Sequence, residues 1–255
     1  MSPHPTLTPS SEPKPAVTFI RSVLFFIYFV VVSVVIHLAA LPTLVLPRST
    51  VVRFSQAWSR AVLWGLKVFA GCGYEVRGEI PKGRVLVAAK HMSIWDTIAL
   101  FMLVDDVCFV VKRELLNIPF YGWYIARAGV IGVDRSAGSR ALRQMAIQAK
   151  PMLAAGRPII IFPEGTRKKP GAPPDYKPGV AGLYSLLGVP CVPTALNSGQ
   201  FWTWFRKDKG TIVIAFLPVI PAGLQRDIFM TDLEQCIEIA TEKLLAEGRA
   251  GRRDG

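Results

Sequence analysis

The 255-residue chain is 51% hydrophobic and carries 30 Lys and Arg against 18 Asp and Glu, which gives it a formal net charge of +12. Its length suits one domain with an appendage better than two full domains, its apolar content indicates lipid, and its charge implies an acidic partner such as nucleic acid, an anionic bilayer or a phosphate-bearing substrate. Its four cysteines form no CxxC pair, which argues against a zinc site or a disulfide framework and favours a reducing compartment.

The N-terminal part of the chain is predicted to hold a leader and a membrane helix. Residues 1–18 are rich in Pro, Ser and Thr, which predicts a disordered leader. Residues 22–40 are almost wholly apolar. As a helix they would span about 28 Å, close to the hydrocarbon thickness of a bilayer. A secretory signal peptide is the competing interpretation, but the apolar run is too long and begins too late for one.

A second helix is predicted over residues 49–70, because Pro42 and Pro47 end the first one. Its polar side chains share one stripe: Arg53, Gln56, Arg60 and Lys67. Apolar side chains occupy its other faces, which is the pattern of an amphipathic helix at a membrane interface. We therefore assign residues 19–70 to membrane-anchoring helices. The pair could form a hairpin that enters one leaflet, or the first helix could cross the bilayer.

Residues 71–247 are predicted to form an α/β domain, because short β-type runs alternate there with helical segments. Seven runs are strand candidates: residues 74–77, 85–89, 107–111, 130–133, 158–162, 189–193 and 212–217. One helix is expected over residues 142–153 with Ser139 as its N-cap, and a last helix is expected to open with a capping box at Thr231. The basic tail, residues 248–255, is expected to be loose.

The first candidate for chemistry is His91, which follows the second strand candidate and lies five positions before Asp96. In a regular helix this offset would turn the two side chains roughly 140° apart. They can meet only if His91 lies in the loop before a helix and Asp96 lies in its first turn. Asp96 could then accept the Nδ1 proton and leave Nε2 free as a base. A polar helix cap is the alternative interpretation of this pattern, and the remaining motifs favour the base.

The second candidate is the turn over residues 162–167, which follows the fifth strand candidate. Gly165 would let a substrate approach the backbone closely, and Arg167 could bind a phosphate through two hydrogen bonds. Two further basic sites, at Lys112 and Arg135, also follow strand candidates. Ligands gather at the carboxyl ends of strands in an α/β sheet. These three sites and the histidine therefore predict one anion-binding pocket that contains a base.

Other nucleotide-binding and nucleophile motifs are missing from the sequence. Gly71-Cys72-Gly73 is the one GxG candidate, but it follows a helix and lacks the third glycine. Neither GxxxxGK[ST] nor GxSxG occurs. We therefore expect no dinucleotide site, no P-loop and no serine nucleophile.

An aromatic and basic cluster precedes the last strand candidate. It consists of Phe201, Trp202, Trp204, Phe205, Arg206 and Lys207. Aromatic side chains beside cations are typical of a membrane-interface anchor. A buried aromatic cluster is the alternative interpretation.

Taken together, these motifs resemble the 1-acyl-sn-glycerol-3-phosphate acyltransferase family over roughly residues 68–217. Four motifs occur in the order that the family uses: His91-x4-Asp96, Gly129 to Arg135, Phe162 to Arg167, and Val189 to Pro193. A basic-acidic-Leu element over residues 112–119 also recurs in the family. In the second motif, Gly132 replaces a usual bulky residue.

The resemblance implies a mixed sheet flanked by helices, behind a membrane-embedded helical hairpin. It also implies a mechanism that needs no cofactor and no metal. His91, oriented by Asp96, would take the proton from the free hydroxyl of lysophosphatidic acid as that oxygen attacks an acyl thioester, and phosphatidic acid would form by direct transfer. The thioester donor would be acyl-CoA or acyl-acyl carrier protein, and the sequence does not distinguish the two.

The resemblance also implies a set of substrate-binding residues: Lys112, Arg135, Glu164, Gly165, Thr166 and Arg167. The three cations of this set would bind the acceptor phosphate. Glu164 would orient the glycerol hydroxyl or Arg167, and backbone amides near Gly165 would stabilise the tetrahedral oxyanion.

Two other functions are alternatives for this sequence. The same chemistry could act on a lysolipid without phosphate, such as a lyso-aminolipid, because arginine also binds carboxylates. A nucleic-acid-binding membrane protein is a remote alternative that rests on charge alone, and it leaves His91 and Asp96 unexplained. The expected location is the cell membrane, with the catalytic domain, residues 71–247, on the cytoplasmic side where thioester donors are made.

Overall fold

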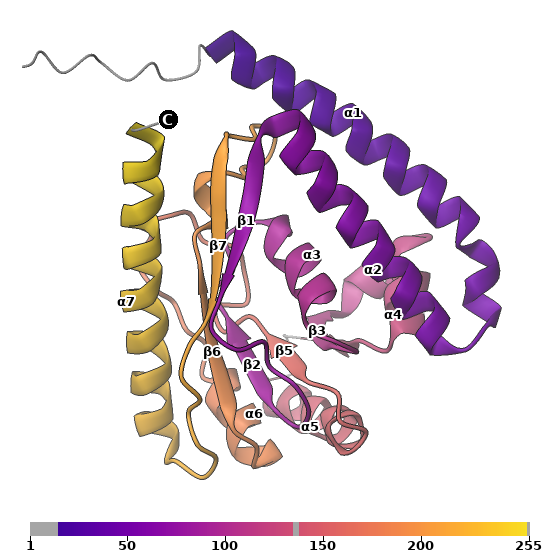
Figure 1. The fold of residues 1–255 in the computed structure, drawn as a ribbon. Coiled ribbons are helices and arrows are strands. Elements are labelled where there is room, and N and C mark those ends of the chain that lie inside the picture. The colour runs from indigo at the N-terminus through magenta and orange to yellow at the C-terminus, as the bar shows by residue number, and fades with distance from the viewer. Residues whose placement is uncertain (1–14, 135–137, 254–255) are drawn as a thin grey trace, which may run out of the picture.

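The computed structural model describes residues 15–134 and 138–253, and a seven-stranded sheet forms its centre (Figure 1). The strands lie in the order β1-β7-β6-β2-β5-β3-β4 across the sheet. In chain order they are β1 Cys72–Arg77, β2 Leu86–Ala89, β3 Cys108–Lys112, β4 Ile131–Val133, β5 Ile159–Ile161, β6 Cys191–Leu196 and β7 Gly210–Phe216. Each strand overlaps one of the seven candidates, so the predicted α/β class is confirmed.

Helices cover both faces of the sheet (Figure 1). On one side are α1 Pro15–Ala39, α2 Arg48–Gly65 and α3 Ile94–Leu103, and on the other are α5 Gly138–Ala154, α6 Gly179–Leu187 and α7 Arg226–Arg253. A further helix, α4 Tyr121–Ala128, contacts α2. The shorter helical turns are η1 Leu41–Val45, η2 Leu66–Ala70, η3 Arg113–Asn117 and η5 Ser198–Gln200.

The strand directions explain why the predicted sites can meet. β2, β5, β3 and β4 are neighbours and run parallel, with Ala88 beside Ile161 and Lys112 beside Val133. β7 runs antiparallel to β6 and pairs in parallel with β1, so the sheet is mixed. The carboxyl ends of the four parallel strands therefore share one edge, where ligands bind in such sheets. Each of the four predicted sites follows or ends one of these strands.

β2 divides its side chains between two cores. Val87 and Ala89 belong to the core beneath α2 and α3, whereas Leu86 and Ala88 belong to the core beneath α5, α6 and α7. Alternate side chains of a strand point to opposite faces, so a strand buried on both faces needs an apolar residue at every position. This requirement explains the uninterrupted apolar runs from which the central strands are predicted.

α1 is the one helix in the described part of the chain that is long and apolar enough to cross a membrane, with a mean hydropathy of 2.6. It is nevertheless attached to the rest of the protein along its length. The hydrogen-bonded pairs are Ser22 with Lys207, Tyr28 with Ala61, Ser33 with Trp58, and His37 with Tyr124. One side of α1 is therefore fixed to the domain, while its other side carries many exposed apolar side chains.

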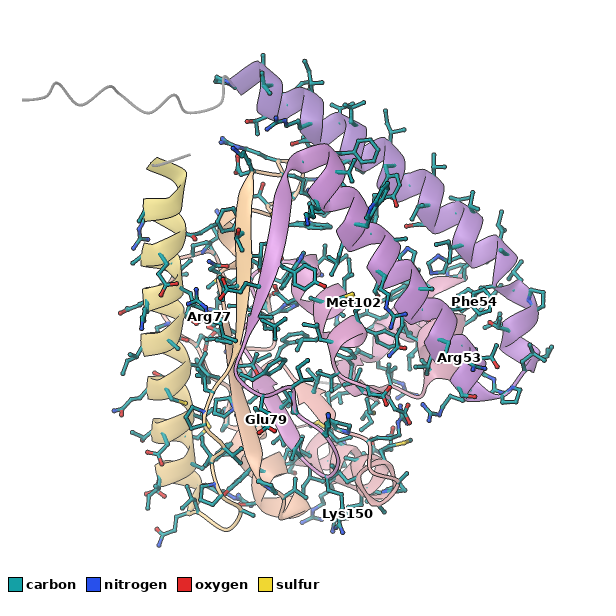
Figure 2. All side chains as sticks on the ribbon, in the orientation of Figure 1. Arg53, Phe54, Arg77, Glu79, Met102 and Lys150 are labelled. Atoms are coloured by element: carbon teal, nitrogen blue, oxygen red, sulfur yellow. The ribbon has the colours of Figure 1, made fainter. Side chains whose placement is uncertain are left out.

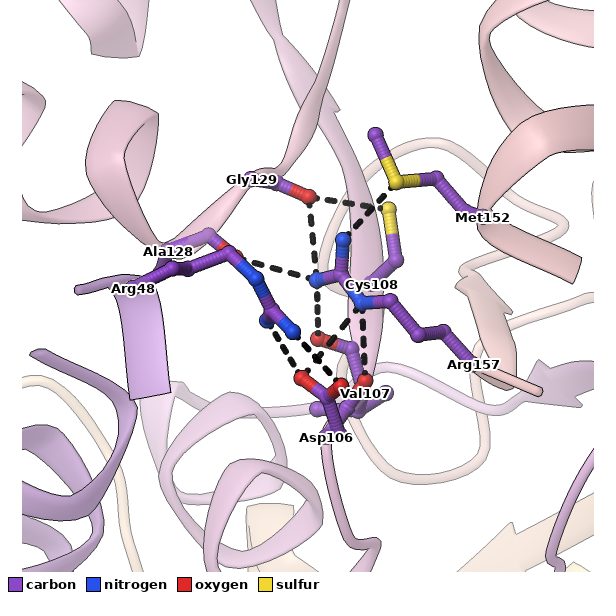
Figure 3. Close-up of polar contacts among 8 residues, drawn as sticks. All are labelled: Arg48, Asp106, Val107, Cys108, Ala128, Gly129, Met152 and Arg157. Carbon is purple, nitrogen blue, oxygen red and sulfur yellow. Dashed lines mark hydrogen bonds and ion pairs between the residues drawn. The ribbon is translucent and has the colours of Figure 1, made fainter. Parts of the chain in front are cut away.

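Two arginines join the start of α2 to the sheet (Figure 3). Arg48 in α2 makes a two-pronged ion pair with Asp106, in the loop before β3. Arg157 is 3% exposed and donates hydrogen bonds to the backbone carbonyls of Asp106, Val107, Ala128 and Gly129. A buried guanidinium needs such partners, because it carries five N–H donors and a charge. The cluster ties α2, α4 and the sheet together, and it is not predicted from the sequence.

The N-terminal helix begins earlier than predicted. Residues 15–18, assigned to the leader, form the first turn of α1, whereas residues 1–14 lie outside the described part of the chain. Proline suits this position, because the N–H that Pro15 lacks would have no partner in the first turn of a helix.

The prediction of a loose tail is wrong over residues 248–253, which continue α7 to Arg253. The part of α7 just before residue 248 is packed and paired. Leu245 is buried, and Glu247 forms an ion pair at 2.7 Å with Arg77 of β1. Figure 2 labels Arg77, between the sheet and α7. These contacts hold α7 against the sheet just before the predicted tail begins.

The two predicted helix starts also differ from the structure. α5 begins at Gly138, so Ser139 is its second residue and not its N-cap. α7 begins at Arg226, so Thr231 lies inside the helix. Phe229 is buried and its ring stacks on that of Tyr184 at 3.8 Å, which extends the packed part of α7 to the N-terminal side of Thr231. Tertiary packing thus overrides the local capping sequence.

Candidate active site

The His91 imidazole and the Asp96 carboxylate meet at the junction of β2 and α3. His91 lies in the loop after β2, and Asp96 is the third residue of α3, whose N-cap is Ser93. The distance between His91 Nδ1 and Asp96 Oδ2 is 2.9 Å. Asp96 also completes a capping box with Ser93. The cap and the histidine partner, considered as alternatives from the sequence, are therefore both realised by one carboxylate.

Several donors hold the buried Asp96 carboxylate in place. Its Oδ2 accepts hydrogen bonds from the backbone N–H groups of Met92 at 2.7 Å and Ser93 at 2.9 Å. Its Oδ1 accepts from the hydroxyl of Ser198 in η5. Because a carboxylate of this kind only accepts, His91 Nδ1 is the donor, and Nε2 is left with a free lone pair. Neutral His91 is thereby set up as a proton acceptor at Nε2.

The turn after β5 packs directly on His91. The Phe162 ring stacks on the imidazole with ring centres 3.9 Å apart and an angle of 14° between the planes. The His91 carbonyl accepts a hydrogen bond from the backbone N–H of Lys168 at 2.8 Å. Gly165 has φ of +67°, a left-handed conformation that favours glycine. The first and third motifs of the sequence therefore form one structural unit.

A buried lysine links this unit to α7. Lys90 is 2% exposed, and its Nζ lies 3.0 Å from Glu164 Oε1 and 2.6 Å from Glu238 Oε1. The Tyr176 hydroxyl donates to the same Glu238 oxygen at 2.8 Å. Burial, and then the neighbouring carboxylates, raise the pKa of Tyr176, which keeps its hydroxyl protonated as a donor. We call these four residues, Lys90, Glu164, Tyr176 and Glu238, the Lys90 cluster.

The Lys90 cluster changes the expectation for Glu164. Its Oε1 binds Lys90, and its buried Oε2 has no hydrogen-bond partner in the described part of the chain. The predicted alternative in which Glu164 orients Arg167 has no hydrogen bond or ion pair to support it among the described residues. Lys90 itself is not predicted from the sequence. One feature of the sequence could have indicated it: Lys90 directly follows a strand candidate that is apolar at every position, and an unpaired charge buried there would be costly.

The predicted cations are less closely assembled than expected. Lys112, at the end of β3, is exposed and pairs with Glu114 at 3.1 Å. Arg167 and Thr166 are exposed in the turn after β5. Arg135 lies outside the described residues. β3 and β5 are neighbours, so Lys112 and Arg167 follow adjacent strands at the same edge, but no contact joins the two side chains among the described residues.

Comparison with known proteins identifies the family. The 1-acyl-sn-glycerol-3-phosphate acyltransferase of Pseudomonas aeruginosa is 36% identical to this chain over 196 residues, which are 75% of this chain and 76% of that protein. The chain belongs to the 1-acyl-sn-glycerol-3-phosphate acyltransferase family. The human 1-acyl-sn-glycerol-3-phosphate acyltransferase alpha is 30% identical over 177 residues, which are 66% of this chain and 62% of that protein.

The fold of this acyltransferase family member agrees with a solved structure. The crystal structure of the 1-acyl-sn-glycerophosphate (LPA) acyltransferase PlsC from Thermotoga maritima matches it with a TM-score of 0.73 at 24% identity, over 89% of this chain and 97% of that one. A family model described as Acyltransferase matches residues 73–197. That range contains His91, Asp96 and Glu164, whereas Glu238 lies beyond it. The predicted resemblance and mixed α/β fold are therefore confirmed.

Proposed function

We propose that this protein transfers a fatty acyl group from a thioester donor to the free hydroxyl of lysophosphatidic acid, giving phosphatidic acid. The observation that carries the proposal is the hydrogen bond between His91 and Asp96, which directs the Nε2 lone pair away from Asp96 at the edge of the sheet where the first and third motifs meet. The names of the similar proteins support lysophosphatidic acid as the acceptor.

The reaction begins with proton transfer to His91. Nε2 takes the proton of the acceptor hydroxyl as its oxygen attacks the thioester carbonyl, and Asp96 stabilises the imidazolium that forms. The tetrahedral intermediate then collapses, the carbon–sulfur bond breaks, and the imidazolium returns the proton to the leaving thiolate. Backbone amides that follow Gly165 in the turn are the proposed donors to the oxyanion, because the Gly165 N–H itself donates to the Phe162 carbonyl at 2.9 Å. The stack of Phe162 on the imidazole keeps its plane fixed through both steps.

Direct transfer agrees with the chemistry of the serine and cysteine side chains. The Ser93 and Ser198 hydroxyls are hydrogen-bonded to each other and both lie beside Asp96, not beside Nε2. Burial raises the pKa of the Cys72 thiol to about 12 and that of the Cys108 thiol to about 11. A thiol must ionise to act as a nucleophile. These groups therefore do not favour an acyl-enzyme intermediate.

We further infer that the protein works at the cytoplasmic surface of the cell membrane. α1 is fixed to the domain on one side and exposes apolar side chains on the other, so the helix and the domain remain together at the bilayer. The exposed cations Arg53, Arg60 and Lys67 of α2 and η2 suit the anionic lipid surface. Either acyl-CoA or acyl-acyl carrier protein would reach the site from the cytoplasm.

A panel of substrates tests this function. The purified protein in vesicles is given lysophosphatidic acid or a lyso-aminolipid, each with acyl-CoA and with acyl-acyl carrier protein. We expect phosphatidic acid from lysophosphatidic acid with at least one donor, and little transfer to the lipid without phosphate. Equal rates on the two acceptors would argue for the alternative substrate, and no transfer to either would contradict the proposal.

A further inference from the structure

The aromatic and basic cluster before β7 forms an ordered turn with a projecting tip. Trp202 and Lys207 pair as an antiparallel bridge, and the Thr203 backbone N–H donates to the Arg206 carbonyl at 3.1 Å. At the tip, Trp204 is 96% exposed. Each interpretation drawn from the sequence therefore holds for part of the cluster. Phe201 and Trp202 are buried, as in a buried aromatic cluster, whereas Trp204 and Phe205 are exposed, as in an interface anchor.

A buried cation holds this turn from within. Lys207 is 5% exposed, and its Nζ donates to the carbonyls of Thr203, Trp204 and Phe205 at 3.2, 3.3 and 3.0 Å. The same Nζ lies 4.9 Å from the centre of the Trp202 ring, within cation–π range. Three backbone carbonyls aimed at one ammonium group fix the path of the chain. Trp204 is thus exposed on an ordered turn.

The turn is continuous with the apolar face of α1. The Lys207 backbone N–H donates to the Ser22 hydroxyl at 2.9 Å, which attaches the turn to α1. The Phe205 ring lies 5.8 Å from that of Phe19 and 6.2 Å from that of Phe26. Phe19 and Phe26 are themselves more than half exposed. Trp204 therefore projects beside the part of the protein that we place in the membrane.

Exposed cations flank the aromatic tip. The Arg206 side chain is 67% exposed, although it pairs with Asp208 at 2.7 Å. Lys209 is exposed and its side chain packs over Gly71, at the end of the short helix that carries exposed Lys67. Tryptophan prefers the boundary between hydrocarbon and water, and cations beside it attract anionic headgroups. This composition matches a lipid interface better than a protein partner, whose contact would bury the cations.

We propose that the turn over residues 203–206 is a second membrane contact, with Trp204 in the headgroup region of the anionic bilayer into which the apolar face of α1 inserts. The proposal rests on the membrane location of α1 given under the proposed function. Trp204 and the first half of α1 would then lie at the same depth in the bilayer, because Phe205 and Ser22 connect them. The turn would then fix the rotation of the catalytic domain about α1.

Site-specific fluorescence tests the depth of the turn in the full chain. Cys236, the partly exposed cysteine among the described residues, is replaced by serine, and Trp204→Cys is labelled with an environment-sensitive dye. Phe26→Cys reports on α1, and Ile147→Cys, an exposed apolar position on α5, is the matched control. The proteins are reconstituted into phosphatidylcholine and phosphatidylglycerol vesicles, with or without lipids brominated near the headgroup. We expect a blue shift and bromine quenching at positions 26 and 204 and neither change at 147.

Three results would overturn the proposal. Quenching at position 26 with a water-exposed probe at 204 would keep α1 in the membrane and remove the turn from it. Exposed probes at both positions would contradict the membrane location of α1 itself. A blue shift at 204 without lipid that grows with protein concentration would show that a second copy of the chain covers the turn.

Discussion

The Asp96 carboxylate has two structural roles. It closes the first turn of α3 as a capping-box residue, and it fixes the tautomer and direction of His91. An amide at position 96 would still accept the two backbone hydrogen bonds, so the helix start should survive. The amide is neutral, however, and would not stabilise the imidazolium that forms when His91 takes the proton. The two roles can therefore be separated by one substitution.

We predict that Asp96→Asn lowers acyl transfer by on the order of 10²-fold or more while the protein remains folded. Asp105→Asn is the matched control, because Asp105 is an exposed carboxylate just after the same helix. Initial rates and circular dichroism of both variants provide the measurement. Activity of Asp96→Asn close to that of Asp105→Asn would mean that the carboxylate serves α3 alone.

Among the described cations, Arg167 is placed best to bind the acceptor phosphate, because it lies in the same turn as Phe162, whose ring stacks on His91. We expect Arg167→Ala to raise the KM for lysophosphatidic acid more than the KM for the acyl donor. Arg84→Ala is the control, because Arg84 is exposed before the opposite end of β2. Steady-state kinetics with each substrate varied in turn distinguish the outcomes. A change confined to kcat would instead place Arg167 at the transition state.

At the scale of elements, α7 completes the site from outside the range of the family model. Glu238 comes from α7, Lys90 from the end of β2 and Glu164 from the turn after β5, so the Lys90 cluster joins three elements across the sheet. Lys90 lies next to His91 in the chain. A change in the cluster should therefore affect both the stability of the fold and the position of the turn.

We predict that Lys90→Met lowers the free energy of unfolding by roughly 3–5 kcal/mol, because it leaves the buried carboxylate of Glu164 and the partly buried carboxylate of Glu238 without a counter-charge. Lys82→Met, at an exposed position before β2, should change it by no more than about 0.5 kcal/mol. Denaturant titration in the same detergent measures both. The double variant Lys90→Met and Glu164→Met should recover part of the loss. Equal stability of the two single variants would show that the buried charges are compensated elsewhere.

What the sequence predicts at this scale depends on how local the signal is. The central strands are predicted because a strand that is buried on both faces needs a continuous run of apolar residues. His91 and Asp96 are predicted because both belong to one short junction. Lys90 meets partners 74 and 148 positions away, and Arg157 meets Asp106 from 51 positions away, so no spacing rule can find them. The predicted cap at Thr231 fails for the same reason, since distant packing extends α7.

For the molecule as a whole, α1 and α2 are part of the main core. Phe25 of α1 and Val62, Leu63 and Leu66 of α2 and η2 are buried in the same cluster as Trp95 of α3. Deleting residues 1–70 would expose this cluster to water. A truncated protein is therefore a poor test of membrane attachment, because loss of the fold would accompany loss of the anchor.

Salt extraction of the intact protein is the better test of attachment. Salt screens the attraction between exposed cations and anionic lipid but does not weaken the burial of apolar side chains. We expect high salt to leave the full chain in the membrane pellet after centrifugation, and detergent to release it. Complete release by salt alone would contradict the insertion of the apolar face of α1.

The central claim is that His91 is the general base of a direct acyl transfer. The most direct measurement is the rate of phosphatidic acid formation by His91→Ala, compared with the unaltered protein in the same vesicles and with the preferred donor. We predict a loss of roughly 10² to 10⁴ in turnover with unchanged folding, since this is the usual contribution of a general base. Near-normal turnover by a well-folded His91→Ala protein would contradict the mechanism.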